Sequence, residues 1–378
     1  MNAPSLTSTS SGTTNCLQDL RLDYVELYVE CLDDQVTHWT DRYGFVVVGT
    51  AGSPDEGFRS AALRQGRITL VVTQGTRDEH PASLYVSRHG DGVADIALQT
   101  EDVVASFAEV VGRGARSVAK PARHNAAGVV ATATVAAFGD IVHTFVQRAG
   151  DATPGLPIGF HPVEQADSTA VGLGDEARLL EIDHFAVCVE IDELDPTVVF
   201  YTQALGFTEI FEERIAVGTQ AMLSKVVQSP SRDITFTIIQ PDPIAEPGQI
   251  DEFLKNHKGP GIQHVAFASY NAACSVRALS SHGVSFLQTP AAYYEMLADR
   301  VDLQHHTLAE LSELNILVDE DHGGQLFQIF TRSTHPRRTL FFEVIERLGA
   351  ETFGSSNIKA LYEAVELERQ RESGRSAR

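Results

Sequence analysis

The segment IDHFAVCV (residues 182–189) repeats the pattern of LDYVELYV (22–29). In both segments, apolar residues alternate in the way that is typical of a β-strand with one buried face. Two further pairs follow in the same order. GPGIQHV (259–265) matches GDGVADI (90–96), and EVIER (343–347) matches TFVQR (144–148). Three matches in one order indicate that the chain contains an internal duplication.

Each half also repeats a shorter theme, in which a strand is followed by a helix and then by further strands. The strand 94–99 precedes the helix 103–112 in the first half, and 265–269 precedes 272–282 in the second. We therefore predict an α+β fold of two tandem domains. Each domain consists of paired βαβββ units that form an incomplete barrel around a central cavity.

Composition sets the predicted domain boundaries. We expect a disordered tail over 1–20, which is rich in Ser and Thr, and a structural domain over 21–150. A Gly- and Pro-rich linker is expected over 151–178. The catalytic domain is expected over 179–366, with a frayed tail over 367–378. The last predicted helix, from Asn357 to Arg369, closes the domain and runs into the start of this tail.

The bulk charge excludes several classes of partner. The chain has 378 residues and a formal net charge of -22, so neither nucleic acid nor an anionic membrane surface is an expected partner. The four cysteines are scattered and form no CxxC pair, which argues against a thiolate zinc site. No signal peptide and no membrane span are indicated, and we expect a cytoplasmic protein.

The two halves differ where chemistry is concerned. The second half has His184, His264 and Glu343 where the first half has Tyr24, Asp95 and Thr144. Two imidazoles and one carboxylate are the ligands of non-haem Fe(II) oxygenases. We therefore predict that the second half binds Fe(II) and that the first half is structural. Another cluster, His305, His306 and His322, lies near an acidic turn and is interpreted as a solvated loop.

Several segments of the second half resemble one family. GPGIQH (259–264), NILVD (315–319), LFQIFT (326–331), LFFEVIER (340–347) and FGSSNIKAL (353–361) are similar to motifs of the 4-hydroxyphenylpyruvate dioxygenases. The resemblance covers nearly the whole chain from about residue 20. It implies the vicinal-oxygen-chelate fold, the cofactor Fe(II), and the substrates O2 and 4-hydroxyphenylpyruvate. By position, His184, His264 and Glu343 match the iron ligands of the family.

Three positions depart from the dioxygenase pattern. Thr237 replaces a proline, Ile239 replaces an asparagine, and Ile358 replaces a phenylalanine. These exchanges resemble the sister branch of the family, the 4-hydroxymandelate synthases. That branch shares the substrate and the iron but hydroxylates the benzylic carbon. We expect Ile239 and Ile358 to reshape the wall of the pocket so that this carbon faces the oxidant.

The resemblance also implies a set of pocket residues. Thr237, Ile239, Gln328 and Ile358 are the predicted catalytic residues. The predicted substrate-binding residues are Ser224, Thr237, Ile239, Gln249, Gln263, Gln328, Phe330, Phe353, Asn357 and Ile358. Ser224 and Thr237 are candidates for the phenol, because a buried hydroxyl requires a partner.

Three functions remain open from the sequence. The first is formation of 4-hydroxymandelate, which the resemblance links to 4-hydroxyphenylglycine and peptide-antibiotic biosynthesis. The second is a dioxygenase that forms homogentisate in tyrosine catabolism. The third is a metal-free protein that binds an aromatic ligand, although this function would not require the His, His and Glu set. The sequence also leaves a homodimer open.

Overall fold

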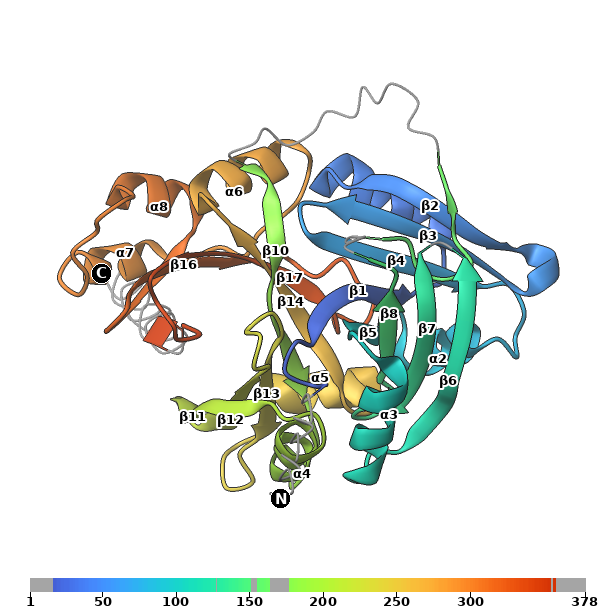
Figure 1. Cartoon of the computed structure of the whole chain (residues 1–378). Helices are drawn as coiled ribbons and strands as arrows, with labels where there is room; N and C mark the ends of the chain where they lie inside the picture. The colour runs from blue at the N-terminus through green and yellow to red at the C-terminus, as the bar shows by residue number, and fades with distance from the viewer. Residues whose placement is uncertain (1–15, 127, 151–154, 164–176, 355, 358–378) are drawn as a thin grey trace, which may run out of the picture.

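The computed structural model describes residues 16–126, 128–150, 155–163, 177–354 and 356–357. Each half of the chain forms one curved mixed sheet with helices packed against it (Figure 1). The two sheets have corresponding strand orders, which confirms the predicted duplication and the tandem α+β fold.

The first sheet has the order β6-β7-β8-β5-β1-β4-β3-β2-β9. Its strands are β1 (Arg21–Tyr28), β2 (Val46–Ser53), β3 (Phe58–Gln65), β4 (Ile68–Gly75), β5 (Gly92–Gln99), β6 (Ser117–Ala126), β7 (Val129–Ala136), β8 (Val142–Arg148) and β9 (His161–Pro162). The helices are α1 (Leu32–Thr37), which continues as the π-helix η1 (His38–Arg42), the 3-10 helix η2 (Pro54–Glu56), α2 (Pro81–His89) and α3 (Val103–Gly112).

The second sheet has the order β11-β12-β13-β10-β14-β17-β16-β15. Its strands are β10 (Leu179–Cys188), β11 (Thr208–Val217), β12 (Gln220–Gln228), β13 (Thr235–Pro241), β14 (Gly261–Ser269), β15 (Leu317–Asp321), β16 (Gly324–Phe330) and β17 (Phe341–Leu348). The helices are α4 (Leu194–Val199), which continues as the π-helix η4 (Phe200–Ala204), α5 (Gln249–His257), α6 (Ala272–Ser281), α7 (Ala291–Leu297) and α8 (Leu308–Leu314).

The strand pairing contains four βαβββ units. In each half the first strand is parallel to the last strand of its own unit, as in β1 with β4 and β10 with β13. The two units of a half are joined by an antiparallel pair, β1 with β5 and β10 with β14. In each half, the helix before the second strand is followed by a left-handed glycine, Gly44 (φ 71°) or Gly206 (φ 75°). Glycine commonly ends helices because it adopts this conformation without strain.

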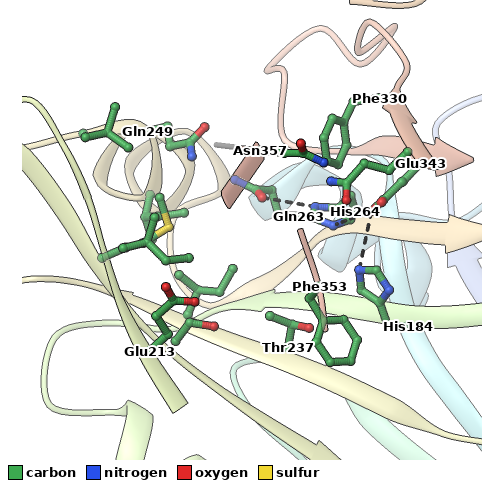
Figure 2. Close-up of a pocket in the computed structure, with 18 of the residues that line it drawn as sticks. His184, Glu213, Thr237, Gln249, Gln263, His264, Phe330, Glu343, Phe353 and Asn357 are labelled. Atoms are coloured by element: carbon green, nitrogen blue, oxygen red, sulfur yellow. Dashed lines mark hydrogen bonds and ion pairs between the residues drawn. The ribbon is translucent and has the colours of Figure 1, made fainter. Parts of the chain in front are cut away.

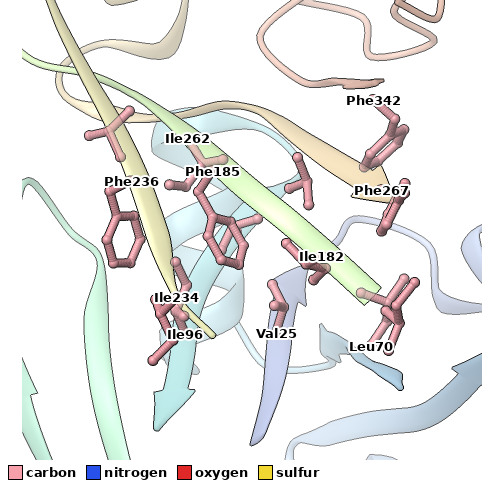
Figure 3. Close-up of a cluster of buried hydrophobic side chains, with 14 of the residues drawn as sticks. Val25, Leu70, Ile96, Ile182, Phe185, Ile234, Phe236, Ile262, Phe267 and Phe342 are labelled. Carbon is pink, nitrogen blue, oxygen red and sulfur yellow. The ribbon is translucent and has the colours of Figure 1, made fainter. Parts of the chain in front are cut away.

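One hydrophobic core joins the outer faces of the two sheets. Val25 and Ile96 of the first half lie in the same cluster as Ile182, Phe185 and Phe236 of the second (Figure 3). Successive strand residues point to opposite faces. Because Phe185 faces this core, its neighbour His184 faces the concave side of the second sheet.

Two predicted boundaries need correction. Residues 16–20 were expected in a disordered tail, but Leu17 is 1% exposed and Leu20 is fully buried, so both belong to the core. Residues 155–163 were expected in the linker. They add β9 to the first sheet instead, and Phe160 packs with Tyr24 inside its barrel. Both segments contain large apolar residues that gain stability from burial.

Of the predicted helix 357–369, only Asn357 lies within the described residues. Within the described part of the chain, no helix is long and apolar enough to cross a membrane.

Candidate metal centre and substrate pocket

His184, His264 and Glu343 meet on the concave face of the second sheet. Their ligand atoms all lie within 4.8 Å of one another, and no other such group occurs among the described residues. The Glu343 Oε2 atom is 3.5 Å from His184 Nε2 and 3.4 Å from His264 Nε2. The structure thus brings together the three residues that the repeat comparison selected.

Strand register explains why they meet. His184 on β10 and Glu343 on β17 both lie opposite Ala266 on β14, which runs between them. His264 precedes Ala266 by two residues and therefore shares its face. The small, fully buried side chain of Ala266 leaves room for the three larger side chains around it.

Hydrogen bonds at the far side of each imidazole fix its orientation. His184 Nδ1 donates to Asp183 Oδ1 at 2.8 Å, and His264 Nδ1 lies 3.3 Å from Gln263 Oε1. Both Nε2 atoms consequently face the space beside Glu343. Metal-binding histidines commonly use this arrangement, in which the second nitrogen donates to a neighbouring acceptor.

Asp183 is itself held by Arg347 through hydrogen bonds of 2.7 and 2.8 Å. Burial alone would raise the pKa of Asp183, but the hydrogen bonds from Arg347 and His184 outweigh it and lower the pKa well below its ordinary value. At His264, burial lowers the pKa more than Glu343 raises it. An ionised Asp183 and a neutral His264 ring are the forms that favour metal ligation.

Aromatic rings pack around the two histidines. Phe341 stacks on His264 with a centroid distance of 4.9 Å, and Phe330 meets it edge-on at 5.7 Å. Phe353 meets His184 edge-on at 5.2 Å. Arg347 lies over the Phe353 ring and donates to the carbonyl of Thr352, so it also positions this aromatic wall.

The equivalent place in the first half holds no comparable group of ligands among the residues that the structure describes. In the first half, Asp95 pairs with Glu26 on β1. In the second half, His264 pairs with Ala186 at the equivalent position of β10. Burial raises the pKa of Asp95 to about 8 and that of Glu26 to about 7. Tyr24 packs with Phe160 in an apolar cluster that fills this barrel.

The centre opens into a cavity of about 480 Å³ that is mainly apolar. Ligand sites typically have this size and character. The cavity is lined by every predicted pocket residue that the structure describes: His184, Ser224, Thr237, Ile239, Gln249, Gln263, His264, Gln328, Phe330, Glu343, Phe353 and Asn357. Figure 2 shows the three candidate ligands at one end of this cavity. Ile358 lies outside the described residues.

Four buried polar atoms in this lining have no hydrogen-bond partner: Glu213 Oε2, Thr237 Oγ1, Gln328 Oε1 and Asn357 Nδ2. Burying such atoms without partners costs free energy, and they are therefore candidates to bind a polar ligand. The donor set of two imidazoles and one carboxylate, buried and facing this cavity, fits a non-haem iron.

Several lining residues were not among the predicted pocket residues, notably Glu213, Ile215 and Met222. They lie on β11 and β12, where the residues that face the cavity cannot be identified without the register. The cluster at residues 305–322 also differs in part from its interpretation. His306 is buried, and its Nε2 atom lies 2.9 Å from Glu346, although His305 and His322 are exposed.

Comparisons with known proteins agree with this geometry. Residues 181–329 match the model of the Glyoxalase/Bleomycin resistance protein/Dioxygenase superfamily. The 4-hydroxyphenylpyruvate dioxygenase of Yarrowia lipolytica is 30% identical over 381 residues, which cover 97% of this chain and 96% of that protein. The Neurospora crassa enzyme of the same name is 33% identical, with coverages of 92% and 90%.

A solved structure is more similar in sequence than these relatives. It is a triple mutant of 4-hydroxymandelate synthase from Streptomyces coelicolor, which is 43% identical with a TM-score of 0.81. The match covers 92% of this chain and 98% of that one.

The fold and the comparisons therefore define an oxygenase of the glyoxalase and dioxygenase superfamily. More narrowly, the chain belongs to the 4-hydroxyphenylpyruvate dioxygenase family.

Proposed function

We propose that this protein converts 4-hydroxyphenylpyruvate and O2 to 4-hydroxymandelate and CO2, with Fe(II) as its cofactor. One oxygen atom enters the carboxylate that remains after decarboxylation, and the other enters the benzylic C–H bond. The similarity to 4-hydroxymandelate synthase supports this proposal.

His184, His264 and Glu343 would hold the iron through their inward-facing Nε2 and Oε2 atoms. Fe(II) at this site would activate O2 for the oxidative decarboxylation of the 2-oxo acid and for the hydroxylation that follows. The apolar lining would limit the access of water to the reacting atoms.

The amide residues are suited to bind the oxygen-rich end of the substrate. Asn357 Oδ1 accepts a hydrogen bond of 2.8 Å from Tyr293, which leaves the unpartnered Nδ2 free to donate. Gln263 and Gln328 also line the cavity. Their amide groups can donate to the carboxylate of an aryl pyruvate.

The ring would lie among Phe330, Phe353 and the wall formed by β13. The observation that carries the choice of product is the position of Ile239. Ile239 on β13 pairs with Ser224 on one neighbouring strand and with Cys188 on the other. Its side chain packs in an apolar cluster with Ile250 and Phe253 of α5. A branched apolar side chain at this position gives the aromatic ring no polar contact, so the ring can adopt a pose different from one set by an amide.

The relatives named 4-hydroxyphenylpyruvate dioxygenase make ring hydroxylation to homogentisate the second candidate. It has the same requirements for iron, O2 and substrate. We further propose that the product serves 4-hydroxyphenylglycine formation for a peptide antibiotic, on the basis of the resemblance to the synthase branch.

The experiment is to load the protein with Fe(II) anaerobically, add 4-hydroxyphenylpyruvate, and record O2 uptake and CO2 release. We expect both in a 1:1 ratio, and neither in the iron-free protein or in His264→Ala. Binding of the oxo acid without O2 uptake would contradict the proposal and favour a metal-free binding protein.

A further inference from the structure

Glu213 is a carboxylate in the apolar wall of the cavity, away from the candidate metal centre. Figure 2 shows Glu213 on the side of the cavity opposite Glu343 and His184. It belongs to β11, the edge strand of the second sheet, which lies three strands from β10. At about 4.8 Å per strand, this separation is about 14 Å along the curved sheet.

Strand register turns this side chain inward. Glu213 lies opposite Ser224 on β12, and Ser224 lies opposite Ile239 on β13. The three residues therefore form one row on the concave face. The neighbouring residue, Glu212, points to the other face, where its Oε1 atom lies 3.6 Å from Lys225 Nζ.

The surroundings of Glu213 leave one oxygen without a partner. Its Oε2 atom is buried and accepts no hydrogen bond, whereas Phe211, Ile215 and Met222 supply apolar surface nearby in the same lining. A buried carboxylate oxygen in such a place gains free energy from a donor. A carboxylate oxygen accepts hydrogen bonds, so a ligand group with an O–H or N–H would complete the site.

We propose that Glu213 is the residue that selects a para-hydroxylated ring. In this proposal, which rests on the proposed function, Oε2 accepts the hydrogen bond of the phenol of the substrate. The 2-oxo acid end lies at the metal centre, and the phenol lies at the opposite wall, beside Ser224. Glu213 is thus a specificity-determining and positioning residue that fixes the far end of the ring.

The proposal predicts a preference that can be measured without turnover. A site that offers an acceptor to a hydroxyl disfavours an analogue that lacks the hydroxyl. Fe(II)-loaded protein should therefore bind 4-hydroxyphenylpyruvate about 10- to 100-fold more tightly than phenylpyruvate. Anaerobic calorimetric titration with each acid measures both dissociation constants.

Three variants make the test specific. Glu213→Val should lose the 10- to 100-fold preference and bind phenylpyruvate within about twofold of the unmodified protein. Glu213→Gln should keep part of the preference, because its amide oxygen still accepts. Glu212→Gln makes the same charge change on the same strand but on the other face, and it should leave both constants unchanged.

Equal binding of the two acids by the unmodified protein, or no binding of either, would overturn the proposal. Equal weakening of both acids by Glu213→Val would also overturn it, because that result describes a general disturbance of the pocket. These readings do not depend on O2 uptake or on the product. A failure of the proposed reaction would therefore be visible separately.

Discussion

The carboxylate of Asp183 connects Arg347 to His184, and Asp23 makes the equivalent pair with Arg148 in the first half. The ion pair is thus present in both copies of the duplicated scaffold, whereas the histidine is present in one. In the second half this pair also orients a candidate metal ligand. The two pairs provide a matched comparison within one chain.

We predict that Asp183→Asn weakens Fe(II) binding by about 10- to 100-fold, because the acceptor that orients His184 loses its charge. The measurement is the iron dissociation constant from anaerobic competition with a chelator. Asp23→Asn is the control. Its pair with Arg148 is more deeply buried, so this variant should lose more stability while it retains its iron affinity. Equal losses of iron affinity would contradict the prediction.

Glu343→Gln should abolish stable iron binding, with an affinity at least about 100-fold lower, because the only carboxylate of the candidate centre becomes a neutral amide. Iron retained after desalting measures the effect, and circular dichroism checks the fold. Glu346→Gln changes the same charge on the opposite face of β17 and should retain iron. An iron content of one per chain in Glu343→Gln would show that the ligands lie elsewhere.

Ile239→Asn should shift the ratio of 4-hydroxymandelate to homogentisate toward homogentisate by at least about tenfold, which corresponds to about 1.4 kcal/mol between two barriers. The asparagine amide would give the substrate ring a polar contact in the cavity wall, beside its cross-strand neighbour Ser224. Chromatography against authentic standards measures the ratio. Ile215→Asn places the same amide elsewhere in the lining and should leave the ratio unchanged. Ile358→Phe is expected from the resemblance to act in the same direction as Ile239→Asn.

Asp95→Asn should stabilise the protein at high pH. Burial raises the pKa of Asp95 to about 8, so the folded state keeps a proton that the unfolded chain releases near pH 4. The contribution of Asp95 to the free energy of unfolding is fully present below about pH 4, and it is lost as the pH rises to about 8. Asparagine at this position can keep the hydrogen bond from the Thr144 N–H, and because it does not ionise, its contribution to stability does not fall as the pH rises.

The melting temperature of Asp95→Asn should therefore exceed that of the unmodified protein by a margin that grows from pH 5 to pH 8, equivalent to at least about 1 kcal/mol at pH 8. Thermal unfolding over this range measures the margin. A constant or shrinking margin would show that Asp95 is not held protonated.

The grouping of His184, His264 and Glu343 at the candidate metal centre was predictable from sequence, because it depends on strand alternation and on comparison of the two halves. His184 and Phe185 are adjacent, and an apolar partner on one face places the other residue on the concave face. The alignment of Asp95 with His264 rests on the repeated segments 90–96 and 259–265, and it does not require the conformation of the turns between strands. The observed register bears out this match through Glu26 and Ala186.

Glu213 was not predictable because a β-bulge decides which way it points. The pairing of β11 with β12 shifts between Glu209 and Phe211, and this shift turns Phe211 and Glu213 toward the cavity. Without the bulge, Glu212 would face inward. A sequence with adjacent glutamates gives no sign of which one is buried.

The segment 155–163 was not predictable for a different reason. Its Gly and Pro residues indicate a loop, but Leu156 approaches Gly49 on β2, and Phe160 fills the barrel. These contacts join segments that are far apart in the sequence. They fill the space in the first barrel that corresponds to the cavity of the second half. Local propensity does not reveal such contacts.

The most direct test of the account is the identity of the product from Fe(II)-loaded protein, 4-hydroxyphenylpyruvate and O2. The two candidate products are isomers, so they must be separated by chromatography and compared with authentic standards. We predict 4-hydroxymandelate, because in the proposed function the wall at Thr237 and Ile239 directs the benzylic carbon to the oxidant. Homogentisate as the main product would contradict the account and would make these exchanges irrelevant to the choice of carbon.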